Sequence, residues 1–424
     1  MISKILLLVI ALLGAPLFIV ITAGAIAGFS QEEVDLAVIP IEIYRLAETP
    51  ILIAIPLFTF AGYLLGESNA PSRLVKLTNA LLGWLPGGLA IMSLVTCAIF
   101  TAFTGASGVT IVALGALIFP ALKEAGYSDH FNLGLITSSG SLGVLFAPSL
   151  PLILYGVVVQ QLGLDHPVSI DDLFLAGLLP GLLMIVLLSI WSMLHKRQPI
   201  IQDKKLEFSD VLKAVRESIW ELPLPFIVLG GIYSGFFAVS EAAAITALYV
   251  LIIEVFVLKE ISVSNLSRLV RESMVMVGGI LIILGASLAF TNYMIDTEVP
   301  MRMFETIKSY VDSKWTFLIL LNVFLLILGM MLDIFAALVI IIPIIFPIAM
   351  SYGIHPVHLG IVFLANMQIG YFTPPIGMNL FIASYRFKRP VMDLYRATIP
   401  FFFILLLSVL IITYWPDLSL FLLK

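Results

Sequence analysis

Two groups of small and hydroxyl-bearing residues interrupt otherwise apolar sequence, and their oxygen atoms suit a small hard cation. Sodium takes oxygen ligands, and hydroxyls together with unwound backbone carbonyls supply them without burying a charge. The candidate sodium ligands of the first group are Ser107, Thr110, Ser138, Ser139, Gly140 and Ser141. Those of the second group are Gly329, Asp333, Gly370 and Thr373. The ordinary alternative for any one of these hydroxyls is a hydrogen bond to its own helical turn.

Glycine and proline residues beside both groups predict breaks in the helices that carry them. Proline removes an N–H donor and interrupts the ladder of helical hydrogen bonds, so that nearby carbonyls become free to face a ligand. The predicted break residues are Gly105, Gly108, Pro148, Pro151, Pro374 and Pro375. Broken backbone is not tolerated facing lipid, and its occurrence at corresponding positions of two halves indicates the binding site of a secondary transporter.

Four further assignments concern polar residues near these breaks, and each has an alternative. Asp333 is the only carboxylate expected inside a hairpin, which indicates either a functional role or capping of the following helix. Ser149, Asn366 and Asn379 flank the breaks and are candidate substrate contacts. The alternative for the asparagines is hydrogen bonding between neighbouring helices.

The composition identifies the class of protein. Of the 424 residues, 61% are hydrophobic and only 12% are charged, which is about half the charged fraction of a soluble domain. We therefore predict an all-α protein with many membrane-spanning helices. The single cysteine, Cys97, excludes a disulfide framework and a cysteine metal site. Because His, Asp and Glu residues do not cluster, we expect no enzyme activity, no organic cofactor and no nucleic-acid partner.

Apolar segments along the chain give the expected spans. They lie at 5–27, 50–66, 89–103, 109–122, 131–157, 174–194, 224–258, 274–294, 315–331, 334–350, 357–385 and 398–416. The first resembles a signal peptide, but it is long enough to span a membrane, and we expect a retained helix. The stretch 224–258 is long enough for two spans, with a turn near 238–241 where Ser240 is expected to cap the second helix.

The basic residues predict which loops face the cytoplasm, since cytoplasmic loops are enriched in Lys and Arg. The loop 195–218 is the most basic, and 259–271 and 386–396 are also basic, as is the region of Arg73 and Lys76. The acidic loops 31–35 and 165–172 are expected on the outer side. For these sides to agree, we expect segments 89–122 and 315–350 to enter and leave on one side, as re-entrant hairpins. Four full spans in place of the hairpin arms would give the same sides, so charge does not exclude that alternative.

An internal repeat organises the chain. Phe119-Pro120, Gly126 and Gly143 recur 227 residues later as Phe346-Pro347, Gly353 and Gly370. The predicted first repeat covers 1–222, with a hairpin at 89–122 and a broken helix at 131–157. A linking helix at 223–240 leads to the second repeat, 241–424, with a hairpin at 315–350 and a broken helix at 357–385. Five crossings separate a span from its copy, and because five is odd, the two repeats are expected to be inverted.

Two mixed-polarity segments are expected to connect each pair of spans to its hairpin. They lie at 68–84 and 298–314, and their apolar residues recur at helical spacing. We predict arm helices lying at the membrane interface. The alternative is that both segments are simple connecting loops.

The second half carries motifs of a known family. Leu328-Gly-Met-Met-Leu-Asp333, Ile342-Pro-Ile-Ile-Phe-Pro347 and Thr373-Pro-Pro-Ile-Gly-Met-Asn-Leu380 strongly resemble the large membrane subunit of tripartite ATP-independent periplasmic (TRAP) transporters. The resemblance covers essentially the whole chain. The first half departs at the hairpin tip, where Thr104-Gly-Ala-Ser-Gly-Val109 stands in place of the family's Ser-Gly-Ser-Gly-Pro-Ala.

The resemblance implies sodium-coupled import of a small organic anion, such as a carboxylate, across the inner membrane of a bacterium or archaeon. It implies two partners, a small four-helix membrane subunit and a periplasmic substrate-binding protein. It also implies an elevator, in which the hairpins and broken helices carry substrate past a scaffold. A stand-alone sodium–dicarboxylate symporter of the same superfamily is the nearest alternative. A membrane-embedded enzyme would need clustered His, Asp or Glu residues near one membrane face, and the sequence shows no such cluster. A receptor or scaffold function would not explain the paired helix breaks.

Overall fold

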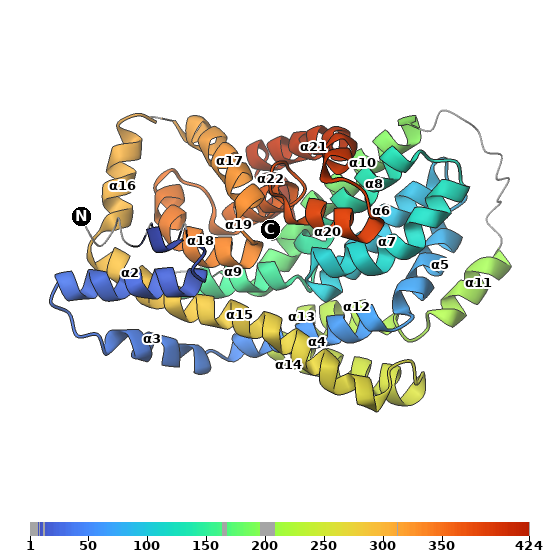
Figure 1. Cartoon of the computed structure of the whole chain (residues 1–424), viewed down its shortest axis with the longest axis horizontal. Coiled ribbons are helices and arrows are strands. Elements are labelled where there is room, and N and C mark those ends of the chain that lie inside the picture. Colours follow the sequence, from blue (N-terminus) through green and yellow to red (C-terminus); the bar gives the residue numbers. More distant parts are fainter. Residues whose placement is uncertain are drawn as a thin grey trace.

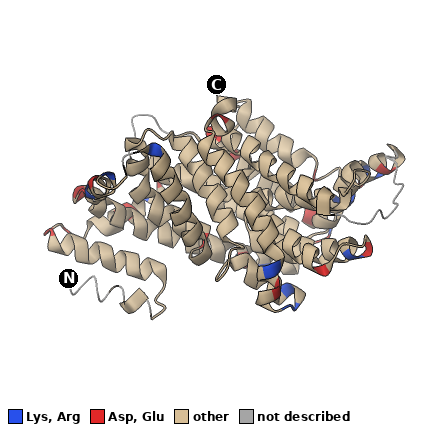
Figure 2. Ribbon diagram, turned by 90° about the horizontal axis from the view of Figure 1, so that it is seen from above, with Lys and Arg blue, Asp and Glu red and all other residues tan. Residues whose placement is uncertain are grey.

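The chain is built from helices, in agreement with the predicted class. A computed structural model describes residues 7, 9–11, 13–162, 168–195, 208–311 and 313–423, and no strand occurs among them. Eight described helices are long and apolar enough to cross a membrane, or nine if a bent pair counts as one span. Figure 2 shows the charged residues mainly toward the edges of the molecule, around a centre that is largely uncharged.

One layer of helices runs along one side of the molecule, at the bottom of Figure 1. We call it the scaffold layer, and its members are α2 (Leu17–Gln31), α3 (Val38–Ala47), α4 (Ala54–Glu67), α14 (Val239–Leu251) and α15 (Val263–Asp296). Helix α15 contacts α2, α3 and α4, while α4 also packs against α14. The predicted span 274–294 is therefore the second part of one 34-residue helix.

The other layer contains two helical hairpins and two interrupted helices, and we call it the hairpin block. Its first part consists of α6 (Gly88–Thr104), α7 (Ser107–Glu124), α8 (Asp129–Ser139), α9 (Leu150–Gln160) and α10 (Ile170–His195). Its second part consists of α17 (Lys314–Met331), α18 (Ile334–Ser351), α19 (Pro356–Gly370), α20 (Met378–Phe387) and α21 (Val391–Tyr414). The same order of elements thus occurs twice along the chain.

Both predicted arms are helices, so the alternative of connecting loops is wrong. The first arm is α5 (Ala70–Leu82) and the second is α16 (Val299–Lys308). Each follows a helix of the scaffold layer and leads into a hairpin. The first arm packs against α6, α7 and the amphipathic helix α11 (Phe208–Glu217), and the second packs against α18.

Close backbone approaches recur at equivalent positions of the two halves. A Cβ atom on Gly143 would lie 2.4 Å from the Ala102 nitrogen, and one on Gly370 would lie 2.4 Å from the Gly329 Cα. The members of these two pairs are 227 residues apart in each case. Only glycine lets a helix come this near to another backbone, so each hairpin is packed tightly on the interrupted helix that follows it.

The two interrupted helices also touch each other. The Ser141 hydroxyl donates a hydrogen bond of 3.1 Å to the Gln368 carbonyl oxygen. These residues are again 227 apart, so a residue contacts its own counterpart. Such a self-contact is typical of two units related by a two-fold axis.

Several sequence predictions are wrong in detail. The apolar run 5–27 is not one helix, because the backbone turns at Gly14, which has a φ of 87°, and α2 begins only after Pro16. The linking segment is helical only from 223 to 233, so it is shorter than the predicted helix at 223–240. It consists of three short consecutive elements, one of which is a π-helix. Ser240 lies inside α14, whose start is instead capped by the Glu241 carboxylate accepting from the Ala238 N–H at 2.9 Å.

The two helices of the first hairpin are longer than predicted, and the tip between them is shorter. Helices α6 and α7 have 17 and 18 residues, and only Gly105 and Ala106 separate them. Gly108 is therefore helical rather than part of the break. Much of the basic loop 195–218 and of the acidic loop 165–172 lies outside the described residues.

Candidate functional site

The tip of the first hairpin is held between a scaffold helix and an interrupted helix. A Cβ on Gly62 of α4 would lie 2.5 Å from the Thr104 Cα, so the scaffold backbone touches the tip directly. Gly105 has a φ of 65°, which favours glycine, and a Cβ there would meet the Leu150 side chain at 2.4 Å. The start of α7 therefore lies beside the start of α9.

Buried hydroxyl groups and a carbonyl form a compact set of oxygens behind this tip. The hydroxyls of Thr101 and Thr110 lie 2.7 Å apart, and Thr101 donates to the Gly140 carbonyl oxygen at 2.9 Å. Both threonines are buried. The structure thus brings together two of the predicted ligands, Thr110 and Gly140, with the start of α7. These oxygens carry no formal charge, which suits a monovalent cation with oxygen ligands.

A second contact draws the other half of the chain into this region. The Ser107 hydroxyl donates to Asn379 Oδ1 at 2.8 Å, and Asn379 Nδ2 donates to the Thr137 carbonyl oxygen at 3.3 Å. All three side chains are buried. Asn379 lies in the first turn of α20, so the start of α7 lies beside the start of α20 as well as beside that of α9.

The N-cap residues of these three helices do not cap them with their own side chains. The N-cap residues are Ala106 for α7, Ser149 for α9 and Gly377 for α20, and none makes a side-chain capping hydrogen bond. The hydroxyls of Thr104 and Ser149 are buried and have no hydrogen-bond partner within the described part of the chain. Helix starts carry partial positive charge, which favours an anionic ligand. At the start of α20 one N–H group is already used, because the Asn379 N–H donates to the Tyr371 carbonyl oxygen at 2.9 Å.

The remaining predicted ligands of the first group have local partners. Ser138 donates to the Gly134 carbonyl oxygen at 2.8 Å, and Ser139 donates to that of Ile136 at 3.4 Å. This is the back-bonding alternative that the sequence left open. Ser141 is used in the contact between the two interrupted helices. Their roles as sodium ligands stay predictions.

The second hairpin is organised around one carboxylate. Asp333 Oδ2 accepts from the Phe335 N–H at 3.0 Å, so Asp333 caps α18. Its Oδ1 accepts from the Tyr371 hydroxyl at 2.9 Å, and the same hydroxyl oxygen accepts from the Ile334 N–H at 2.7 Å. Tyr371 begins the break between α19 and α20, so this carboxylate ties the hairpin tip to the break.

The second break contains few free side-chain oxygens. Thr373 donates to the Ile369 carbonyl oxygen at 2.8 Å, inside its own turn. The Gly370 carbonyl oxygen accepts from the Thr373 N–H at 3.0 Å. Pro374 and Pro375 follow within this break, as Pro148 does in the first break, while Pro151 lies in the first turn of α9. Gly329 packs closely against Gly370, and its role as a sodium ligand stays a prediction.

Asn366 takes part in a hydrogen-bond network between helices. Its Nδ2 donates to Asn322 Oδ1 at 2.6 Å, and the Thr413 hydroxyl donates to the same oxygen at 3.1 Å. The Asn366 Oδ1 atom is buried and has no partner among the described residues. The network matches the alternative of interhelical bonding, while the free oxygen leaves a substrate contact as a prediction.

Two crevices separate the scaffold layer from the hairpin block. One has a volume of about 420 Å³ and is lined by α4, α15, α20 and the Val112 region of α7. The other has a volume of about 300 Å³ and is lined by α3, α9, α15 and the Val339 region of α18. Val112 and Val339 are 227 residues apart, so the two crevices occupy equivalent places in the two halves.

Sequence reasoning missed Thr101, Tyr371 and Asn322. Thr101 lies in an uninterrupted apolar helix, where a threonine ordinarily bonds to its own turn. Tyr371 and Asn322 gain their roles only from partners that are 38 and 44 residues away in the sequence. These separations are too large for the two residues of either pair to be brought together by a single helical turn or a tight turn.

Known proteins similar to this chain are membrane permeases. The family described as "Tripartite ATP-independent periplasmic transporter, DctM component" matches residues 3–418. The chain is 33% identical over 381 residues to the C4-dicarboxylate TRAP transporter large permease protein DctM of Pseudomonas aeruginosa, covering 90% of this chain and 88% of that protein. It is 31% identical over 419 residues to the ectoine/5-hydroxyectoine TRAP transporter large permease protein UehC of Ruegeria pomeroyi, covering 98% and 96%.

Two further similarities concern a longer relative and a solved structure. The isethionate TRAP transporter permease protein DctMQ of Oleidesulfovibrio alaskensis is 36% identical over 374 residues, but this chain spans only 58% of its length. The solved structure of the Alcanivorax borkumensis YdaH transporter has a TM-score of 0.59 at 16% identity, covering 88% of this chain and 89% of that one. That likeness establishes a shared fold.

Proposed function

Because the chain belongs to the DctM family of tripartite ATP-independent periplasmic transporters, we propose that it is the transport subunit that couples sodium entry to import of a small organic anion. As a multi-pass protein of this family, it would lie in the inner membrane of a bacterium or archaeon. It would act with a small four-helix membrane subunit and would receive substrate from a periplasmic binding protein.

The observation that carries this proposal is that the start of α7 lies beside the starts of α9 and α20 and beside a set of uncharged oxygens. Two buried hydroxyls in this region, those of Thr104 and Ser149, have no partner among the described residues. An anion would be stabilised by the N–H groups and the dipoles of these helices. A transporter needs such a site where its broken helices meet.

The proposed sodium ligands at the first hairpin are the oxygens of Thr101, Thr110, Ser107 and Gly140. In the structure these atoms hydrogen-bond to one another or to Asn379. Sodium would replace these hydrogen bonds with coordination, and it would be transported rather than kept as a resident ion. At the second hairpin, Asp333, Gly370 and Thr373 remain proposed ligands.

The two halves would be inverted relative to each other, and the hairpin block would move against the scaffold layer as an elevator. The self-contact between Ser141 and Gln368 and the equivalent crevices on the two sides of the block support this arrangement. Single cysteines placed in the loops 123–130 and 351–356, on a Cys97→Ala background, should be labelled from opposite sides of the membrane. Labelling from the same side would contradict the inversion.

Reconstitution tests the function as a whole. The chain, with a small subunit and a binding protein of the same family of transporters, is placed in liposomes under an inward sodium gradient. Candidate substrates are those named for the relatives: C4-dicarboxylates, isethionate, ectoine and sialic acid. We expect uptake of one of them that needs sodium and the binding protein. Sodium-driven uptake without either partner would favour a stand-alone symporter, and uptake that is indifferent to sodium would contradict the coupling.

A further inference from the structure

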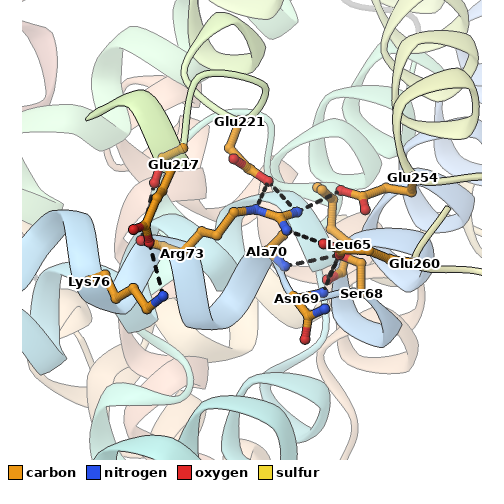
Figure 3. A network of polar contacts seen from close by, with 11 residues as sticks. Leu65, Ser68, Asn69, Ala70, Arg73, Lys76, Glu217, Glu221, Glu254 and Glu260 are labelled. Carbon is orange, nitrogen blue, oxygen red and sulfur yellow. Dashed lines mark hydrogen bonds and ion pairs between the residues drawn. The ribbon is translucent and has the colours of Figure 1, made fainter. Parts of the chain in front are cut away.

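A buried arginine lies where the first arm helix leaves the scaffold layer. Arg73 is in the first turn of α5, and its side chain is 11% exposed. Three carboxylates surround it, as Figure 3 shows, and each comes from a different segment. Glu221 follows α11, Glu254 lies in the π-helical end of the span 239–257, and Glu260 lies in the connection to α15.

The contacts of Arg73 hold the arm to the rest of the molecule. Its Nε donates to Glu221 Oε1 at 2.6 Å, and its Nη2 lies 3.4 Å from Glu254 Oε1. Its Nη1 donates to Glu260, whose other carboxylate oxygen accepts from the Asn69 N–H at 2.7 Å. The beginning of the arm is thus tied to the scaffold layer through charged hydrogen bonds.

The charges in this cluster do not balance. One guanidinium faces three carboxylates, and the Glu221 and Glu254 side chains are only 4% and 1% exposed. Glu221 Oε2 and Glu254 Oε2 are both buried and have no hydrogen-bond partner within the described part of the chain. A buried carboxylate oxygen without a donor is costly, so the cluster needs at least one positive charge more than the described residues supply.

A proton supplies that charge better than a metal ion does. The Glu254 carboxylate receives a contact from Arg73 only at Oε1, at 3.4 Å, and its Oε2 has no donor within the described part of the chain, so a proton on Glu254 would remove a buried charge that is otherwise poorly compensated. Among the described residues, no group of His, Cys, Asp and Glu side chains is arranged to hold a metal ion. Arg73 already occupies the centre of the cluster, where a metal would have to lie.

The remaining charged neighbours do not neutralise the excess. Lys76 is paired with Glu217 at 2.9 Å on the exposed edge of the arm. The Tyr249 hydroxyl donates to the Trp220 carbonyl oxygen at 2.9 Å. Burial raises the pKa of Glu221 despite its bond to Arg73. Burial also acts to raise the pKa of Glu260, but its hydrogen bonds to Arg73 and Asn69 lower that pKa on balance.

We propose that this Arg73 cluster is a proton-binding site, in which one proton held by Glu254 completes the anchor of the first arm helix. Loss of the proton leaves a buried, poorly compensated carboxylate beside Arg73 and loosens the start of α5. The other end of the arm is tied to the hairpin, because the Thr78 and Thr96 hydroxyls lie 2.6 Å apart. On the proposed transport function, the state of this site would change the transport rate without touching substrate or sodium.

The purified chain tests the site without any transport assay. Infrared spectra should contain a protonated-carboxyl C=O band that disappears in Glu254→Gln, which keeps the side-chain size. The matched control is Glu217→Gln, at the exposed edge of the same arm, and it should keep the band. A wild-type spectrum without such a band, or one unchanged by Glu254→Gln, overturns the proposal and leaves water as the partner of these oxygens.

The pH dependence of unfolding gives a second readout. An unfolded chain releases this proton above the usual glutamate pKa of about 4.3, whereas the folded chain keeps it to higher pH. The unfolding constant should therefore rise about tenfold per pH unit in the wild type until the site empties. The Glu254→Gln variant should lack this component and the Glu217→Gln variant should keep it. Equal pH profiles in wild type and Glu254→Gln also overturn the proposal.

Discussion

The two hairpins begin their second helices in opposite ways at equivalent positions. Ala106 precedes α7 and Asp333 precedes α18, and these residues are 227 apart. The Ala106 side chain does not cap the first start, and the hydroxyl of Thr104 beside it has no hydrogen-bond partner among the described residues. The second is capped by a carboxylate that Tyr371 holds in place. On the proposed function, the first start would be available to an external anion, whereas the second has the Asp333 carboxylate as an anion of its own.

This difference in capping indicates different roles for the two halves. In the first half, ligand binding would complete interactions that the protein leaves open. In the second half, the carboxylate completes them already, so the hairpin is held together in the absence of a ligand. The comparison can be tested with two kinds of substitution. One kind changes packing that both halves have in common, and the other changes polar contacts that differ between the halves.

The largest expected effect concerns packing that both halves share. Gly143→Ala and Gly370→Ala each place a methyl group 2.4 Å from a neighbouring backbone atom. Each should destabilise the protein by about 1 to 3 kcal/mol or prevent its folding, because backbone cannot move aside as a flexible side chain does. Thermal unfolding measures the effect, and Gly278→Ala, with nothing within 4 Å, is the control. Tolerance of either substitution would show that the two halves are not packed alike.

Removal of the second cap should have a smaller effect. Asp333→Ala should lower stability by about 1 to 2 kcal/mol, since the α18 start loses its cap and Tyr371 loses its acceptor. Asp333→Asn should retain most of the stability because asparagine also caps helices. Thermal melts without sodium compare the three proteins. Equal unfolding temperatures of Asp333→Ala and the wild type would contradict a structural role for this carboxylate.

The buried threonine pair should matter for sodium rather than for folding. Thr101→Val removes the hydroxyl that joins Thr110 to the Gly140 carbonyl, and we expect about tenfold weaker sodium dependence of uptake, or about 1.4 kcal/mol of binding energy. Ser93→Ala is the matched control, because this buried hydroxyl of the same helix donates to the Leu89 carbonyl oxygen of its own turn and Ser93 is not among the proposed ligands. Equal sodium dependence of the two variants would place the sodium ligands elsewhere.

The smallest effects should distinguish the two breaks. Ser107→Ala breaks the contact with Asn379 and should weaken the sodium dependence of uptake about fivefold, as expected for one hydrogen bond of about 1 kcal/mol. Thr373→Ala should have less effect, since that hydroxyl bonds to its own turn. Unchanged sodium dependence in both variants would sink the assignment of ligands at the breaks. A larger effect of Thr373→Ala would reverse the comparison.

Much of the architecture could be predicted because apolar length and glycine or proline breaks determine it locally. The hairpins, the arm helices and the capping by Asp333 all follow from nearby residues. The failures have physical reasons as well. Pro16 divides an apolar run that is long enough to span, and Glu241 caps α14 through a contact that Ser240 does not make.

The parts of the site that could not be predicted depend on distant partners. Thr101 becomes part of an oxygen cluster only because α8 ends beside it. In the sequence, Arg73 serves only to assign its region to the cytoplasmic side, whereas in the structure it is buried among carboxylates from segments about 150 to 190 residues away. Such contacts depend on tertiary packing, which the periodicity of a helix does not predict.

The most direct test of sodium binding at the first hairpin is the thermal unfolding of the purified chain in sodium chloride against choline chloride at equal ionic strength. Sodium at about 100 times its dissociation constant should stabilise the folded protein by about 2.7 kcal/mol if it binds only that state. We predict a sodium-specific rise in the unfolding temperature of the wild type and the loss of most of that rise in Thr101→Val. Equal unfolding temperatures in the two salts, or an undiminished rise in the variant, would contradict the account.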